Sequence, residues 1–180
     1  MTPNTPDLWL KSLKFVFDTT LLSNFAIVEQ VTLLETLYRG KVCTTLMVAD
    51  ELHQGLYAGY HQLQSVEEIL TPLHSTGWLP VLSLELAEEK KLYTQFSPPL
   101  ASGEASCLAI AVARGLVLGS DDLAARRVAN GRNVHLTGTI GILIRAVREG
   151  YWPLDRANEV LAQMIALRYH APTARLDDLI

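Results

Sequence analysis

The sequence is poor in several features, and each shortage excludes a class of protein. It holds only two cysteines, Cys43 and Cys107, both in apolar surroundings, which excludes a disulfide-rich secreted scaffold and favours a reducing compartment. No apolar run approaches the roughly 18 residues of a membrane-spanning helix, and no basic stretch followed by an apolar one marks a signal peptide. We therefore expect a soluble, cytoplasmic protein without a membrane partner.

Several enzyme motifs are missing as well. The five histidines are scattered without the spacing of a zinc site, and there is neither a glycine-rich phosphate loop nor a serine or cysteine nucleophile motif. The net charge of −4 at pH 7 argues mildly against a large basic surface for nucleic acid. It does not exclude a nuclease, because a site built from carboxylates is neutralised by the cations that it binds.

The chain does hold ample apolar material for one domain. Hydrophobic residues make up 49% of the 180 residues and charged residues 19%, which is enough to bury a two-sided core. We expect a flexible N-terminal lead-in over residues 1–13, a single domain over 14–172 and a C-terminal appendage over 173–180.

Short β-rich runs alternate with helical patterns through this domain. The expected strands are 13–17, 42–45, 77–82, 116–120 and 133–136, and the expected helices are 20–26, 29–38, 46–63, 85–96, 102–113, 123–129, 140–148 and 153–169. Residues 66–73 should add a helical turn or two, and Pro80 should make its segment an edge strand or a poor one. The alternation predicts an α/β fold with three layers, in which helices cover both faces of a mostly parallel sheet of four to five strands.

Acidic residues stand where two of these strands end and near the start of two helices. These residues are Asp18, Glu51, Glu104, Asp121 and Asp122. Because reactive groups gather at the carboxyl ends of strands in open α/β sheets, these side chains should converge. Crowded carboxylates repel one another, and a hard cation such as Mg²⁺ or Mn²⁺ would hold them ionised and activate a water for attack on a phosphodiester.

Each acid also has a simpler interpretation when it is taken alone. Asp18 fits an N-cap, Glu104 fits a first-turn acid that favours the helix dipole, and Glu51 fits a solvated helix face. The neighbouring aspartates fit one cap and one surface charge. The positions taken together are harder to explain as capping, which favours a shared metal site.

Five stretches, in this order along the chain, resemble the motifs of the PIN-domain family. They are Val16–Phe25, Val48–Gly55, Gly103–Ala111, Leu118–Arg126 and Thr137–Leu143. The set is specific, although no single stretch would suffice. The Gly103-Glu104 pair is typical of a PIN subfamily described as predicted nucleic-acid-binding proteins, whereas many PIN domains have aspartate at the second of these positions.

The resemblance implies a PIN-like fold and a Mg²⁺- or Mn²⁺-dependent endoribonuclease that cuts single-stranded RNA. The metal-binding, catalytic carboxylates would be Asp18, Glu51, Glu104 and Asp121. Asp122 is a further candidate ligand, since the sequence does not decide between the two neighbouring aspartates. The residues that would support Asp18 or contact the substrate are Thr19, Ser23 and Asn24.

Arg126 follows the aspartate pair by about one helical turn. It fits a contact to a substrate phosphate and fits equally well a salt bridge to a nearby acid. Proteins similar to this one often act as the toxin of a toxin–antitoxin pair. The resemblance therefore also implies a small antitoxin protein as partner and a homodimer.

Two other functions fit parts of the pattern. A non-catalytic PIN-fold module for binding or regulation should have lost one or more of the acids, and here all four positions are filled. A receiver-like phosphoacceptor domain would need a lysine after a late strand, and residues 136–141 contain none.

Overall fold

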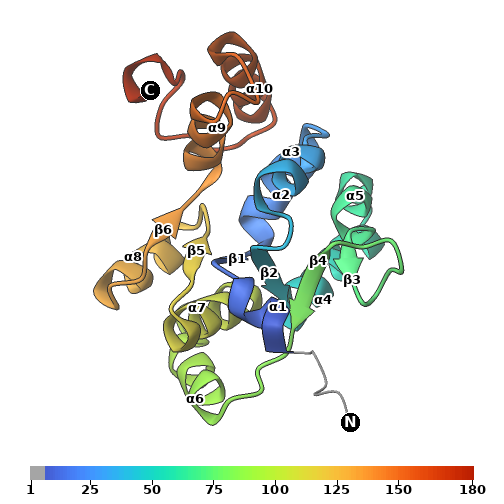
Figure 1. Cartoon of the computed structure of the whole chain (residues 1–180), viewed down its shortest axis with the longest axis vertical. Helices are drawn as coiled ribbons and strands as arrows, with labels where there is room; N and C mark the ends of the chain where they lie inside the picture. Colours follow the sequence, from blue (N-terminus) through green and yellow to red (C-terminus); the bar gives the residue numbers. More distant parts are fainter. Residues whose placement is uncertain (1–6) are drawn as a thin grey trace.

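Six short parallel strands form the centre of the molecule in the computed structural model, which describes residues 7–180 (Figure 1). The strands are β1 (Phe15–Phe17), β2 (Val42–Thr45), β3 (Leu70–Thr71), β4 (Leu79–Leu82), β5 (Val117–Gly119) and β6 (Leu136–Thr137). They pair in the order β3-β4-β2-β1-β5-β6. The order reverses between β1 and β5, and ligands of open α/β sheets bind at such a switch point.

Helices cover both faces of this sheet, as the alternation of patterns predicts. They are α1 (Asp7–Ser12), α2 (Thr19–Ile27), α3 (Val31–Tyr38), α4 (Leu46–Tyr57), α5 (Gln64–Glu67), α6 (Ala87–Phe96), α7 (Ser102–Arg114), α8 (Leu123–Gly131), α9 (Thr139–Arg148) and α10 (Leu154–Ala166). Two 3-10 turns, η1 (His61–Leu63) and η2 (Asp177–Leu179), complete the set. In Figure 1, α2, α3 and α5 lie above the sheet and α6 and α7 lie below it. The predicted three-layer α/β fold is confirmed.

Helix α7 is an apolar helix that packs against one face of the sheet at its centre. Its residues 105–111 are small or aliphatic and all are buried, and the helix contacts β1, β2 and β5. A helix that is apolar on every side is stable only when it is covered, and each fully buried large aliphatic side chain contributes about 1.5–3 kcal/mol. This packing fixes the N-terminus of α7 at the edge of the sheet where β1 and β5 end.

The segment from Val66 to Leu73 differs from the expected helical turns. Helix α5 ends at Glu67, and Leu70 and Thr71 then pair with Leu79 and Pro80 as the edge strand β3. A strand of two residues is too short for a periodic pattern, so only its burial against β4 defines it. The sheet consequently has six strands rather than four to five.

Of the two alternatives predicted for the Pro80 segment, an edge strand or a poor one, the edge strand is wrong. Strand β4 lies inside the sheet, because it pairs with β3 on one side and with β2 on the other. Proline is tolerated there because the strand is short, with only two paired residues on each side, and few ladder hydrogen bonds are lost.

Three further segments differ in their structure from what the sequence predicts. The helix predicted over 46–63 stops at Tyr57, where Gly59 turns the chain with a φ of +97°. Within the predicted lead-in, residues 7–12 form α1, and residues 1–6 lie outside the described residues. The predicted C-terminal appendage includes the fully buried Leu176. No helix between residues 7 and 180 combines the length and the apolar character needed to cross a bilayer.

Candidate active site at the carboxylate rim

The carboxyl ends of β1 and β5 bring two distant acidic positions together. Phe17 pairs with Gly119 in the parallel register, and the Asp18 amide donates to the Gly119 carbonyl at 3.0 Å. Asp18 therefore lies beside Ser120, immediately before Asp121, although about a hundred residues separate them along the chain. We call the acids gathered here (Asp18, Glu51, Glu104, Asp121 and Asp122) the carboxylate rim.

Asp18 is fully buried and uses only one of its two oxygens. Its Oδ1 accepts hydrogen bonds from the Leu21 amide at 2.9 Å and from the Thr20 hydroxyl at 2.8 Å, which makes it the N-cap of α2. Its Oδ2 has no hydrogen-bond partner among the described residues. Capping needs one oxygen, so the simpler interpretation leaves a buried acceptor unexplained.

Burial is the largest cause that raises the pKa of Asp18, from 3.8 to about 7. The Leu21 amide and the hydroxyls of Ser120 and Thr20 oppose this shift, and the charge of Asp121 adds to it. The ionised form of a carboxyl is destabilised by burial and by a like charge nearby, and here these two effects outweigh the donors. A cation at the rim would remove that penalty.

Glu51 connects α4 to the first turns of α2 and α7. Its Oε1 accepts from the Gly103 amide at 2.7 Å and from the Ser102 hydroxyl at 3.0 Å, and its Oε2 accepts from the Thr19 hydroxyl. A Cβ atom at Gly103 would overlap the Glu51 carboxylate. The Gly-Glu motif therefore needs its glycine for this close approach rather than for a special φ.

Glu104 lies half-buried at the start of α7. Its Oε2 accepts from the Ala101 amide at 3.1 Å, as a first-turn acid does. Burial is the largest cause that raises the pKa of Glu104, and the charges of Asp122 and Glu51 raise it further. The negative charges of Glu51 on α4 and of Asp122 after β5 therefore act on Glu104.

Both oxygens of Asp121 are held by protein donors. The Thr139 amide donates to Oδ1 at 3.0 Å and to Oδ2 at 3.2 Å, and the Thr139 hydroxyl donates to Oδ2 at 2.6 Å. The Asn24 side-chain amide reaches Oδ2 at 3.0 Å, and the Tyr169 hydroxyl reaches Oδ1 at 3.2 Å. A Cβ atom at Gly138 would lie 2.7 Å from Oδ1, so this glycine also makes room for the acid.

Asp122 is held more loosely than its neighbour. Its Oδ1 accepts from the Ala125 amide at 2.7 Å as the N-cap of α8, and its own amide donates to the Ser120 hydroxyl at 3.1 Å. Its Oδ2 accepts no hydrogen bond within residues 7–180. The two neighbouring aspartates therefore differ: Asp121 is fixed through both oxygens, and Asp122 keeps one free.

The residues predicted to contact substrate are partly committed to the rim itself. Thr19 bonds to Glu51, and Asn24 bonds to Asp121. Arg126 forms no salt bridge to an acid within residues 7–180, and its Nη1 donates to the carbonyls of Ser120 at 2.7 Å and Thr137 at 3.1 Å. Ser23 is half-buried, and its hydroxyl makes no hydrogen bond in the described part of the chain. Substrate contact by these side chains stays a prediction.

The carboxylates of the rim fit a hard divalent cation in their chemical kind. The rim supplies only carboxylate oxygens, which Mg²⁺ and Mn²⁺ prefer, and one of them is the orphaned Oδ2 of Asp18. Among residues 7–180, no three acidic, histidine or cysteine side chains form a ready-made ion shell. Glu51 and Asp121 instead accept hydrogen bonds from protein donors, which fix the positions of the two carboxylates.

Sequence reasoning missed two residues of this site. Thr139 lies in the PIN-like stretch Thr137–Leu143, and its place just after a predicted strand was a usable signal for a site residue. Tyr169 carried no signal, because it lies 48 residues from Asp121 in a segment after the last helix.

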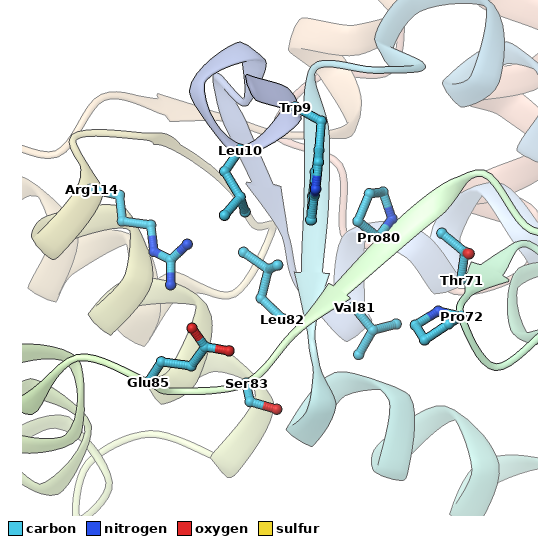
Figure 2. A pocket seen from close by; sticks show the side chains of 10 residues that line it. All are labelled: Trp9, Leu10, Thr71, Pro72, Pro80, Val81, Leu82, Ser83, Glu85 and Arg114. Atoms are coloured by element: carbon cyan, nitrogen blue, oxygen red, sulfur yellow. The ribbon is translucent and has the colours of Figure 1, made fainter. Parts of the chain in front are cut away.

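A cavity of about 500 Å³ lies apart from the rim and includes none of its acids. Trp9 and Leu10 of α1 form one wall, and residues 80–83 at β4 form another. Figure 2 shows Arg114 and Glu85 at one end of this cavity, Thr71 and Pro72 at the other, and Trp9 between them. Arg114 is already paired with the buried Glu89 through a 2.6 Å contact, so its charge is compensated by the fold.

Comparisons with known proteins bear on the family and the fold. The family model DUF3368, described as a PIN domain, matches residues 14–180. No curated protein matches the chain. The structure is similar to PAE2754 from Pyrobaculum aerophilum, with a TM-score of 0.53 and 17% identity over 81% of this chain and 99% of that one.

Two VapBC structures are also similar. DNA-bound VapBC from Salmonella typhimurium has a TM-score of 0.50 and 20% identity over 70% of this chain and 98% of that chain. VapBC2 from Rickettsia felis, bound to a DNA fragment from its promoter, has a TM-score of 0.50 and 17% identity over the same shares. At these identities the structures show a common fold.

Proposed function

Because the chain belongs to the PIN-domain family described as DUF3368, we propose that it is a metal-dependent endoribonuclease that hydrolyses phosphodiester bonds in single-stranded RNA. The observation that supports this most is the buried Oδ2 of Asp18, which has no hydrogen-bond partner within residues 7–180 and whose carboxyl is in the field of Asp121. A structural cap would not need that atom, whereas a cation ligand would.

The proposed metal ligands are Asp18, Glu51, Glu104 and Asp121, with Asp122 as a further ligand. When bound, Mg²⁺ or Mn²⁺ would polarise the phosphodiester and lower the pKa of a water for in-line attack. The protein's part is to orient its own oxygens before the substrate arrives. Gly103 and Thr139 do this for Glu51 and Asp121, as outer-shell groups do in metal sites.

The proposed substrate contacts are Thr19, Ser23, Asn24 and Arg126. Ser23 is the one whose side chain is uncommitted among the described residues, so its hydroxyl is free to meet a ribose or phosphate oxygen. Thr19 and Asn24 act through the acids that they hold. Arg126 has used Nη1 for two carbonyls, which leaves its other guanidinium nitrogens for a phosphate.

We further propose that the protein is the toxin of a toxin–antitoxin pair, that it forms a homodimer, and that a small antitoxin protein inhibits it. The support is the common fold with the VapBC proteins. Induced expression in a bacterial host should stop growth in the wild type but not in Asp18→Asn. Unimpaired growth at equal protein levels would contradict the toxin role without touching the nuclease chemistry.

The nuclease proposal is tested by the cleavage of an end-labelled single-stranded RNA. We expect cleavage with Mn²⁺ or Mg²⁺, none with excess EDTA, and recovery on adding Mn²⁺ back. Asp18→Asn should abolish cleavage, and Asp50→Asn should retain it, because Asp50 is exposed on α4 next to Glu51 but takes no part in the rim. Metal-independent RNA binding with no cleavage in any variant would favour the non-catalytic PIN-fold module instead.

A further inference from the structure

A tyrosine from the end of the chain reaches the carboxylate rim. The Tyr169 hydroxyl donates to Asp121 Oδ1 at 3.2 Å, and the tyrosine side chain is half-buried there. It is the one donor to Asp121 that comes from beyond α10, since Asn24 belongs to α2 and Thr139 to α9. The site therefore depends on a segment that the fold of the sheet does not itself supply.

The chain returns to the rim through a tight reversal after α10. The helix ends at Ala166, Arg168 takes a φ of +76°, and the Tyr169 amide donates to the Met164 carbonyl at 2.9 Å. This is a left-handed helix C-terminus, a conformation that glycine adopts more readily than arginine. Because a residue other than glycine keeps this backbone conformation at Arg168, we infer that the surrounding contacts determine the direction of Tyr169.

The residues that follow Tyr169 are fastened to the same helix. Leu176 is fully buried, and its amide donates to Asn158 Oδ1 at 2.8 Å. The Asn158 side-chain amide donates in turn to Asp177 Oδ2 at 3.1 Å. The reversal and this anchor lie on either side of the segment, so Tyr169 is held from both directions.

The hydroxyl completes a set of donors that fixes the plane of the Asp121 carboxylate. Asn24 and both donors of Thr139 act on Oδ2, whereas the donors to Oδ1 within residues 7–180 are the Thr139 amide and the Tyr169 hydroxyl. A carboxylate turns easily about its Cβ–Cγ bond unless both oxygens are held from different directions. Outer-shell hydrogen bonds of this kind orient metal-ligating carboxylates.

We propose that Tyr169 is a positioning residue, which the folded C-terminal segment holds against Asp121 so that this carboxylate keeps its orientation at the rim. The inference rests on the proposed function in so far as Asp121 serves a metal-dependent reaction. The contact itself is independent of that function and can be tested without metal.

The first experiment uses the full-length protein in EDTA and compares wild type, Tyr169→Phe and Tyr151→Phe by nuclear magnetic resonance. Phenylalanine keeps the ring and removes only the hydroxyl. We expect shifted signals for the Asn24 side-chain amide and the Thr139 amide in Tyr169→Phe, with little change in melting temperature. Tyr151 is 49% exposed and makes no side-chain hydrogen bond within residues 7–180, so its variant should leave both signals unmoved. Unmoved signals in Tyr169→Phe would overturn the proposal.

The second experiment measures Mn²⁺ binding and RNA cleavage for the same three proteins. Loss of an outer-shell donor should weaken Mn²⁺ binding by about 10-fold and lower kcat while KM for RNA stays the same. An affinity and kcat equal to the wild type would overturn the positioning role while the nuclease stands. If Tyr169→Phe shifts the amide signals but the wild type neither binds Mn²⁺ nor cleaves RNA, the contact is supported and the proposed function is contradicted.

Discussion

The Glu51 carboxylate accepts a hydrogen bond from the Gly103 amide at 2.7 Å, and a methyl group on Gly103 would overlap that carboxylate. Alanine in a helix normally stabilises relative to glycine by up to about 1 kcal/mol. We expect Gly103→Ala to do the opposite, because Glu51 must move away. A shift of this kind at the rim should reduce RNA cleavage on the order of 100-fold.

Gly131→Ala is the matched control for that substitution. A Cβ atom at Gly131 meets nothing within 4 Å, and the residue closes α8 away from Glu51. Thermal unfolding and cleavage assays on both variants should give a lower melting temperature and lost activity for Gly103→Ala only. Equal behaviour of the two variants would show that the Glu51 approach is not what the glycine provides.

The raised pKa of Asp18 predicts an unusual pH dependence of stability in the metal-free protein. Between pH 3.8 and about 7 the unfolded chain releases a proton that folded Asp18 retains, so stability falls as the pH rises through this window. The loss by pH 8 amounts to at most about 4 kcal/mol. Asp18→Asn should remove this component while retaining the cap on α2.

Urea unfolding of both proteins in EDTA from pH 4 to pH 8 measures that component as the difference between them. Other carboxylates contribute equally to both curves and cancel. The gap should widen in favour of Asp18→Asn as the pH rises, and addition of Mn²⁺ at pH 8 should close it by stabilising only the wild type. A constant gap would mean that Asp18 titrates normally.

A second buried acid, Glu89, has its pKa shifted in the direction opposite to that of Asp18. Glu89 is fully buried and pairs with Arg114 at 2.6 Å, while its other oxygen accepts the Glu85 and Leu86 amides. Its pKa is lowered, since burial raises it but Arg114 and the two amides outweigh that effect. Glu89→Ala leaves these groups unpaired and should cost about 3–5 kcal/mol.

The effect of Glu89→Ala is structural, so RNA cleavage per folded molecule at low temperature should match the wild type. Chemical unfolding and cleavage under the same buffer conditions measure the two properties. Asp18→Asn should show the opposite pair of results, with stability kept or gained and activity lost. A large loss of cleavage in folded Glu89→Ala would mean that the site extends further than the rim.

The two neighbouring aspartates can be separated by substitution. Asp122→Asn keeps the cap on α8, because asparagine caps helices about as well as aspartate, so stability should change little. Asp121→Asn places an amide against the Thr139 and Tyr169 donors and should cost both stability and Mn²⁺ affinity. Calorimetric titration with Mn²⁺ should show the larger loss for Asp121→Asn. The reverse order would assign the principal ligand to Asp122.

The sequence predicted the sheet and the gathering of acids because both depend on local patterns. Fully apolar runs end in Asp18 and in Asp121, and parallel strands place such ends on one edge. The short strand β3 escaped prediction because two residues show no period, and its definition comes from Leu79 and Pro80 beside it. Pro80 misled for the same reason, since its neighbour was not foreseen.

The hydrogen-bond partners within the site could not be predicted from the sequence. The sequence shows neither that Asp18 caps α2 through one oxygen nor that its other oxygen is buried without a donor in the described part of the chain. The assignment of Arg126 to a phosphate or to an acid missed the carbonyls that it meets. Tyr169 reaches Asp121 only through the reversal after α10, which a pattern of apolar residues does not encode.

A crystal structure of the protein soaked in Mn²⁺, with anomalous diffraction data, tests the central claim most directly. We predict an anomalous peak coordinated by Asp18 Oδ2 together with oxygens of Glu51, Glu104 and the aspartate pair after β5. No peak at the rim at a Mn²⁺ concentration that supports RNA cleavage, or a peak coordinated by other residues, would contradict it.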